Sequence, residues 1–172
     1  MCSDYDLINS LLGYEPETGR FFWKKDRRMG KTGKGILIAE AGCDAGGVAS
    51  DTGYVQIMIA KKKRFGHRIA FLLMTGFWPV GQVDHINGVR SDNRWKNLRD
   101  VPKLVNAQNL RSARVDSKLG VMGVQFHKKS EKYVSRITAN GRKIILGYFD
   151  CAEKAGTAYL KAKRILHSGC TI

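Results

Sequence analysis

The densest polar cluster of the sequence runs through Asp84-His85-Ile86-Asn87-Gly88, Asn97-Leu98-Arg99 and Asn106-Ala107-Gln108-Asn109. Asp84 and His85 are neighbours, so on an extended backbone they point to opposite faces and can serve two partners at one site. Asp84 and an asparagine carbonyl offer oxygen ligands to a hard divalent cation without filling its coordination sphere. The pKa range of His85 suits it to draw a proton from water. Together these groups predict metal-assisted phosphodiester hydrolysis.

The charge of the chain points to a polyanionic partner. The 172 residues carry 30 Lys and Arg against 15 Asp and Glu, a formal charge of +15. The first 60 residues hold seven basic and eight acidic side chains, so the excess lies further along, in stretches such as 52–83 that contain no acidic residue. Long stretches of one sign favour nucleic acid as the partner over a generic soluble surface.

Other properties exclude several classes of protein. The longest apolar run, Ile69–Met74, is far short of a membrane span, and no secretory signal is visible at the start. The four cysteines, Cys2, Cys43, Cys151 and Cys170, form no C-x-x-C pair. This argues against a zinc knuckle or a disulfide framework and fits a reducing cytoplasm. The sequence contains no phosphate-binding glycine loop, so a small-molecule enzyme has little support.

Hydrophobic periodicity gives a coarse map of the first part of the chain. It predicts a helix over residues 4–12, strands over 20–23 and 53–60, and a mostly buried helix over 67–74. Residues 24–47 are expected to form a loop and Lys61–Arg64 a basic turn. Pro102 can occupy the first position of a helix that continues to Leu110.

A second unit is predicted after a linker. Short runs rich in aromatic and β-branched residues, at 123–126, 133–139 and 143–146, predict three strands. Asn140-Gly141 is a strong hairpin signal, and an alanine-rich helix follows from Asp150 to about Leu166. The C-terminal unit is therefore expected to be three antiparallel strands packed on one helix.

The polar cluster resembles the HNH nuclease motif, in the variant with asparagine at the last position that is common in phage-borne and intron-encoded homing endonucleases. The resemblance covers roughly residues 5–112 and includes the upstream stretches 14–23, 53–57, 67–71 and 76–79. It implies an α+β fold with a ββα-metal core over about 65–112 and a β-rich extension over 1–64. The implied organisation is a nuclease domain 1–112, a linker 113–119 and a DNA-binding domain 120–172.

The resemblance also assigns roles. It implies that Asp84 and Asn106 bind one metal ion, that His85 is the general base, and that Asn97 braces the loop and the orientation of the base. Asn is a neutral oxygen ligand, so Mg²⁺ or Mn²⁺ fits better than Zn²⁺. Without zinc-binding C-x-x-C pairs, the core must be held by the N-terminal segment or by packing on DNA. We expect Asn87, Asp92, Asn93 and Asn109 to be structural, and His67 to be structural or a phosphate contact.

Residues 120–168 resemble the DNA-binding domain of plant ethylene-response factors, whose three-stranded sheet lies in the major groove. The resemblance is carried by Gly123-Val124, Lys132-Tyr133, Ile137, Leu146-Gly147-Tyr148-Phe149, Glu153-Lys154-Ala155 and Ala158-Tyr159. Alternation predicts that Val124, Phe126, Tyr133, Ser135, Ile137, Ile144 and Leu146 face the helix. It places Gln125, His127, Lys129, Val134, Arg136, Thr138, Lys143 and Ile145 on the outer face. The polar members of this outer set are the predicted DNA contacts, together with Arg111, Arg114 and Lys118 of the linker.

The sequence as a whole predicts a DNA endonuclease that acts on duplex DNA. One site per chain favours nicking by a monomer, and double-strand cleavage would need a dimer or a second binding event. The resemblance implies a phage- or mobile-element-encoded protein of the bacterial cytoplasm. The alternatives are a non-catalytic DNA-binding regulator with a degenerate nuclease core, and an RNA-binding protein.

Overall fold

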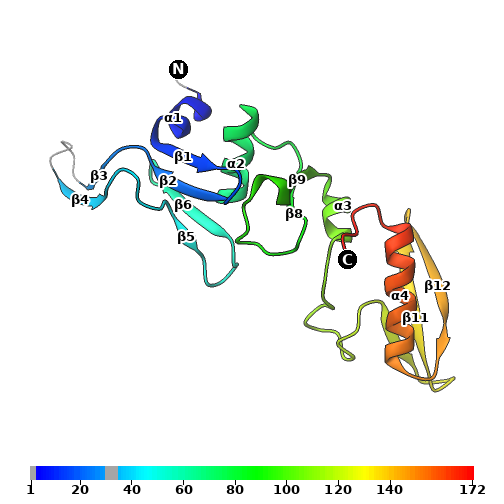
Figure 1. Ribbon diagram of the computed structural model, residues 1–172. Helices are drawn as coiled ribbons and strands as arrows, with labels where there is room; N and C mark the ends of the chain where they lie inside the picture. The colour runs from blue at the N-terminus through cyan, green and yellow to red at the C-terminus, as the bar shows by residue number, and fades with distance from the viewer. Residues whose placement is uncertain (1–2, 30–34) are drawn as a thin grey trace. The chain divides into compact units, whose positions relative to one another are not determined.

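The computed structural model describes residues 3–29 and 35–172. The chain forms two compact units, Met1–Val101 and Pro102–Ile172, and both mix helices with small antiparallel sheets, in agreement with the predicted α+β class (Figure 1). The linker expected at residues 113–119 falls inside the second unit, so the predicted assignment of nuclease and DNA-binding domains stays a prediction. No helix within the described residues is both long enough and apolar enough to cross a membrane.

The first unit is built from short elements. They are α1 (Asp4–Leu11), β1 (Leu12–Glu15), β2 (Arg20–Trp23), β3 (Arg27–Met29), β4 (Ile36–Ala39), β5 (Gly47–Val48), β6 (Val55–Ile59), β7 (Lys62–Phe65), α2 (Gly66–Thr75), β8 (Gln82–His85), the 3-10 turn η1 (Trp95–Asn97) and β9 (Leu98–Val101). The strands form the antiparallel sheets β1-β2, β3-β4, β5-β6-β7 and β8-β9.

Local signals fix the ends of the two helices. Ser3 caps α1: its Oγ accepts the amide proton of Asp6, while its own amide donates to the Asp6 carboxylate, both at 3.1 Å. Gly76 ends α2 in the left-handed conformation (φ 82°) that glycine adopts without strain. These two helices are the ones that the hydrophobic periodicity predicts.

Helix α2 lies at the centre of the first unit's core. It contacts α1, β6 and β7. The buried cluster consists of Ile8, Leu12, Phe21, Trp23, Ala45, Ile57, Ile59, Ile69, Ala70, Leu72, Val83 and Leu98. Val83 on β8 and Leu98 on β9 belong to this cluster, so the β8–β9 pair is anchored in the same core as α2. The residues next to them, Asp84 and His85, are thereby held on a rigid base.

Two sequence-based expectations in this unit are wrong. Residues 24–47 contain the paired strands β3 and β4, rather than one loop, and β5 begins at Gly47. The basic run is strand β7 from Lys62 onward, paired with β6, and the turn lies at Ala60 and Lys61, with φ of 48° and 64°. Both segments expose most of their side chains, so their strands lack the alternation of apolar residues that predicts a half-buried strand.

The second unit contains α3 (Lys103–Gln108), β10 (Val124–His127), β11 (Lys132–Ala139), β12 (Arg142–Phe149) and α4 (Ala152–Leu166). The strands form one antiparallel sheet in the order β10-β11-β12, and α4 contacts all three (Figure 1). Asn140 and Gly141, both with positive φ, make the predicted two-residue turn between β11 and β12. The β11–β12 register shifts between Ser135 and Arg136.

Candidate active site

The β8–β9 hairpin carries Asp84 and His85 side by side. Asp84 pairs with Arg99 and His85 with Leu98 across the hairpin. Both side chains are buried, with 7% and 4% of their surface exposed. Because successive side chains of a strand point to opposite faces, the carboxylate and the imidazole meet different partners.

Asp84 is held by Arg99. Its Oδ2 accepts hydrogen bonds from Nε and Nη2 of Arg99, at 2.9 and 2.7 Å. A charge-assisted contact of this kind fixes the orientation of a buried carboxylate and compensates for its lost hydration. Arg99 lies within the motif, but its partnership with Asp84 depends on the register of the hairpin, which the sequence alone does not give.

His85 is held by rings and by an amide. Its Nε2 lies 3.3 Å from Oδ1 of Asn93, and its ring lies 5.2 Å from that of His67 and 5.7 Å from that of Tyr54. Burial lowers the pKa of His85 below its ordinary value. The imidazole is therefore neutral at neutral pH, and if the proton sits on Nε2 and is donated to Asn93, the lone pair lies on Nδ1.

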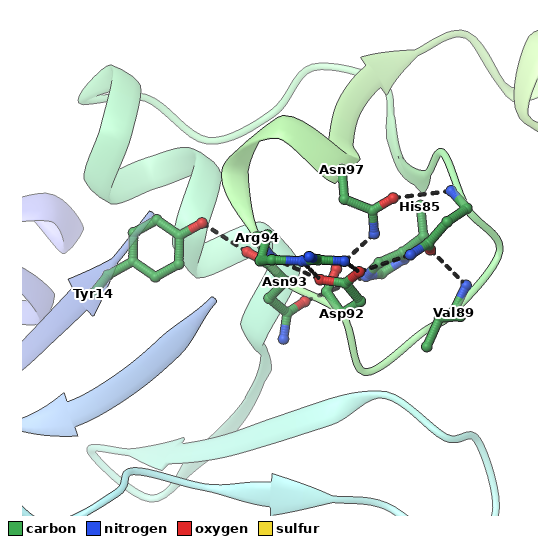
Figure 2. A network of polar contacts seen from close by, with 8 residues as sticks. Tyr14, His85, Val89, Asp92, Asn93, Arg94 and Asn97 are labelled. Atoms are coloured by element: carbon green, nitrogen blue, oxygen red, sulfur yellow. Dashed lines mark hydrogen bonds and ion pairs between the residues drawn. The ribbon is translucent and has the colours of Figure 1, made fainter. Parts of the chain in front are cut away.

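Asn97 closes the loop that follows His85 (Figure 2). Its Oδ1 accepts the amide proton of Asn87 at 2.9 Å, and its Nδ2 donates to the carbonyl of Asp92 at 2.7 Å. Asp92 also accepts from Asn87 Nδ2 at 2.7 Å and forms an ion pair with Arg94. Hydrogen bonds from Arg94 hold the pKa of Asp92 at about 2. Asn93, whose side chain hydrogen-bonds to the imidazole, is expected from the sequence to be structural.

Residues from the N-terminal part of the chain also hold this loop, among them Tyr14 (Figure 2). The hydroxyl of Tyr14 donates to the carbonyl of Asn93 at 2.7 Å, and the amide of Trp95 donates to the carbonyl of Pro16 at 2.8 Å. Gly19 (φ 75°) packs so closely that a Cβ there would lie 2.5 Å from the amide nitrogen of Arg94. Residues 14–19 therefore contact residues 93–95, the segment that contains the hydrogen-bond partner of His85.

His67, at the start of α2, lies buried behind His85. Its ring stacks on Phe65 at 5.4 Å, and its Nδ1 has no hydrogen-bond partner among the described residues. Burial, with the nearby His85 and Arg68 adding to it, lowers the pKa of His67 to about 3. A neutral, buried ring of this kind fits the structural role expected from the sequence better than a phosphate contact.

Replacing His67 by phenylalanine should flatten the acid dependence of stability. The folded-state pKa of about 3 lies below the ordinary value of 6.5, so the unfolded chain takes up the proton first as the pH falls. His67 stabilises the fold fully above pH 6.5 and loses this effect toward pH 3, at about 1.4 kcal/mol per pH unit. Urea unfolding should show that the free energy of unfolding falls between about pH 6 and pH 5 by about 1 kcal/mol less in His67→Phe than in the wild type. Equal losses would contradict a neutral buried His67.

The predicted metal ligands lie in different units. Asp84 is on β8, while Asn106 is on α3 in the second unit, so their pairing at one metal ion stays a prediction. The described residues contain no group of three or more His, Cys, Asp and Glu side chains placed to hold a metal. A carboxylate with an amide oxygen is nonetheless a donor set that suits a hard cation such as Mg²⁺.

The predicted DNA-contacting residues of the second unit lie at its surface. Gln125, Lys129, Arg136, Thr138, Lys143, Arg111, Arg114 and Lys118 are exposed, and His127 is half-buried. Arg136 Nη1 donates to Gln125 Oε1 at 3.4 Å, which joins two members across β10 and β11. Arg111 donates to the carbonyl and the hydroxyl of Thr171 at 3.2 and 2.8 Å.

The expected sorting of the two faces is wrong at three positions. Ile144 on β12, expected inside, is 38% exposed. Val134, expected outside, is fully buried, and Phe126, expected inside, is 47% exposed. Val134 lies on the central strand, where its partners Gln125 and Tyr148 flank it on both sides. Phe126 lies on an edge strand and packs edge-on against Tyr133 at 5.2 Å. Position within the sheet, which alternation does not encode, decides the burial of Val134 and Phe126.

A cationic hollow opens on the first unit near His67. It has a volume of about 430 Å³ and is lined by Lys63, Arg64, Phe65, Arg68 and Trp78. The Phe65 ring that lines it stacks on His67, which in turn touches His85. The hollow is therefore linked to the imidazole of His85 through the rings of Phe65 and His67. Its lining includes Lys63 and Arg64 of the basic run.

Comparison with known proteins bears on this part of the chain. No curated protein and no solved structure matches the chain significantly. Asp84, His85, Arg99 and the loop between them all lie within one segment for which a family is found. Residues 64–108 match the HNH endonuclease family, and this match supports a nuclease of that family.

Proposed function

We propose that this protein is a divalent-metal-dependent DNA endonuclease that hydrolyses phosphodiester bonds. The observation that carries the proposal is the buried, neutral imidazole of His85 next to the oriented carboxylate of Asp84. This pair lies inside the segment that matches the HNH endonuclease family. The charge of +15 supplies the electrostatic attraction that a DNA substrate requires.

In the proposed mechanism His85 is the general base. Asn93 Oδ1 lies 3.3 Å from its Nε2 and orients the neutral ring, which takes a proton from the attacking water. Asn97 keeps the loop closed, which fixes Asn93 and therefore the ring. Asp84 and Asn106 would hold one Mg²⁺ or Mn²⁺ ion, which when bound neutralises charge on the phosphate. Arg99 keeps the carboxylate of Asp84 oriented.

One base and one metal site per chain favour nicking of one strand, as in a monomeric homing-type nuclease. A supercoiled plasmid incubated with Mg²⁺ or Mn²⁺ should be converted to the open circle before linear product appears. A chain that binds the plasmid without nicking it would instead be a non-catalytic regulator. Competition by duplex RNA as strong as that by duplex DNA would favour RNA binding.

We further propose that two basic surfaces bind the DNA backbone. One is the exposed face of β11 and β12 with Arg136 and Lys143, and the other is the hollow with Lys63. A solvated cation that contacts a phosphate releases a counterion on binding, so each contact adds to the salt dependence of affinity.

Replacing Arg136 or Lys143 by alanine should weaken DNA binding and lower the slope of log K against log salt by about one each. Lys63→Ala should do the same from the first unit. Fluorescence anisotropy with labelled duplex between about 50 and 200 mM salt measures this slope. Lys161→Ala, which removes an exposed charge on α4, is the matched control and should leave the slope unchanged. A slope unchanged in the first three variants would place the DNA elsewhere.

A further inference from the structure

Helix α3 is too short to be stable on its own. It has six residues, none of them buried, and its cap residue Pro102 makes no side-chain capping hydrogen bond. Isolated helices this short are not stable in water. Contacts with other parts of the protein must therefore order it, and within the second unit those contacts come from residues 168–172, here called the return segment (Figure 1).

The return segment binds the last turn of α3 through paired polar groups. The amide of Gly169 donates to Oε1 of Gln108 at 3.0 Å. The hydroxyl of Thr171 donates to Oδ1 of Asn109, which is buried. Arg111 Nη2 donates to the same hydroxyl at 2.8 Å and to the Thr171 carbonyl at 3.2 Å. One side chain, Thr171, therefore joins two residues just past the end of α3.

The backbones also approach closely at one point. Gly169 is buried, and a Cβ placed on it would lie 2.0 Å from the carbonyl oxygen of Val105. No side chain fits there without displacing α3, so the return segment lies directly against the helix.

The other end of the same connection is the sheet. His167, next to the return segment, contacts the carbonyl of Thr138 on β11 through its Nε2 at 2.9 Å. Lys163 on α4 is buried and donates to the carbonyl of Leu110. Arg164 donates to the carbonyl of Ile172 at 3.0 Å. Helix α3 is thereby tied to the strands that expose Arg136 and Thr138.

We propose that the return segment is a positioning element, which fixes α3 to the β10–β12 sheet so that the sheet's docking on DNA also sets the orientation of Asn106. This rests on the proposed function, in which Asn106 binds the metal. Thr171 and Gly169 act through α3 and touch neither substrate nor metal. Loss of the tie should therefore weaken metal binding and slow cleavage, with little effect on DNA affinity.

The test uses Thr171→Val, which keeps the shape of the side chain and removes its hydroxyl, and Thr171→Ser, which keeps the hydroxyl. The control is Thr157→Val, the same change on α4, where the hydroxyl donates to the carbonyl of Glu153 at 2.9 Å. For Thr171→Val we expect the Mg²⁺ concentration for half-maximal cleavage to rise and the rate at saturating DNA to fall, each several-fold. The Kd for duplex should stay within about twofold, and Thr171→Ser should behave as the wild type.

Hydrogen exchange of the α3 amides gives a readout that needs no activity. These amides should exchange faster in Thr171→Val than in the wild type or Thr157→Val, while the amides of β11 should not change. Unchanged exchange in α3, or unchanged Mg²⁺ dependence in an active protein, would overturn the proposal. If the wild type did not cut DNA, but the α3 amides still exchanged faster in Thr171→Val than in the wild type, the nuclease assignment and the role of Asn106 would be wrong. The tie itself would then remain.

Discussion

Replacing His85 by alanine is expected to slow DNA cleavage by about 10²–10⁴-fold, the range for loss of a general base. The imidazole is buried, neutral and hydrogen-bonded to Asn93, which suits it to accept a proton from water. DNA affinity should survive, because the predicted DNA-contacting side chains are surface residues of the second unit and His85 is buried in the first.

The measurement is the single-turnover rate at saturating duplex, beside the Kd from anisotropy. The matched control is His127→Ala on β10, which should show the opposite pattern, with a weaker Kd and an unchanged rate once the DNA is saturating. If His85→Ala lost binding and cleavage together, or cut at the wild-type rate, His85 would not be the base.

Asp84→Ala should abolish cleavage and also remove the response of the protein to Mg²⁺. A bound metal contributes several kcal/mol to the reaction, so the expected loss is about 10³-fold or more. The change also leaves the half-buried guanidinium of Arg99 without this carboxylate, which should lower the stability of the fold. Asp84→Asn keeps the shape and one oxygen acceptor, and should lose cleavage with less loss of stability.

Thermal unfolding with and without Mg²⁺ separates the two effects. In the wild type Mg²⁺ should raise the Tm, because a ligand that binds only the folded state stabilises it, and in both Asp84 variants it should not. Asp92→Asn is the matched control, since Asp92 is also paired with an arginine in the same unit. It should lower the Tm and keep its response to Mg²⁺. A Mg²⁺ response retained in Asp84→Ala would remove Asp84 from the metal site.

Elements with a strong apolar face could be predicted from the sequence. Helix α2, strand β6 and the hairpin at Asn140-Gly141 have clear periodicity or turn chemistry, and all lie where they are expected. Strands β4 and β7 are not predicted from the sequence because their side chains are mostly exposed. Backbone pairing holds such strands, and single-sequence periodicity carries no signal for it.

The candidate site was only partly predictable for a related reason. Asp84 and His85 are recognisable as neighbours with complementary chemistry, whereas their partners depend on tertiary contacts. Arg99 reaches Asp84 through the register of β8 with β9. Asn93 reaches His85 because its loop is closed by Asn97 and supported by Tyr14, 79 positions earlier in the chain. Nothing local in the sequence distinguishes Asn93 from the other asparagines of the loop.

The hydrogen bonds made by Tyr14 and Trp95 matter for the design of fusion proteins that contain the segment around His85. The segment that matches the HNH endonuclease family begins at residue 64, yet the hydroxyl of Tyr14 and the carbonyl of Pro16 hold the loop that follows His85. A fusion enzyme made from the recognised segment alone would carry the histidine on an unsupported loop. A fusion protein should therefore include the amino-terminal hairpin, with Gly19, together with the segment that matches the family.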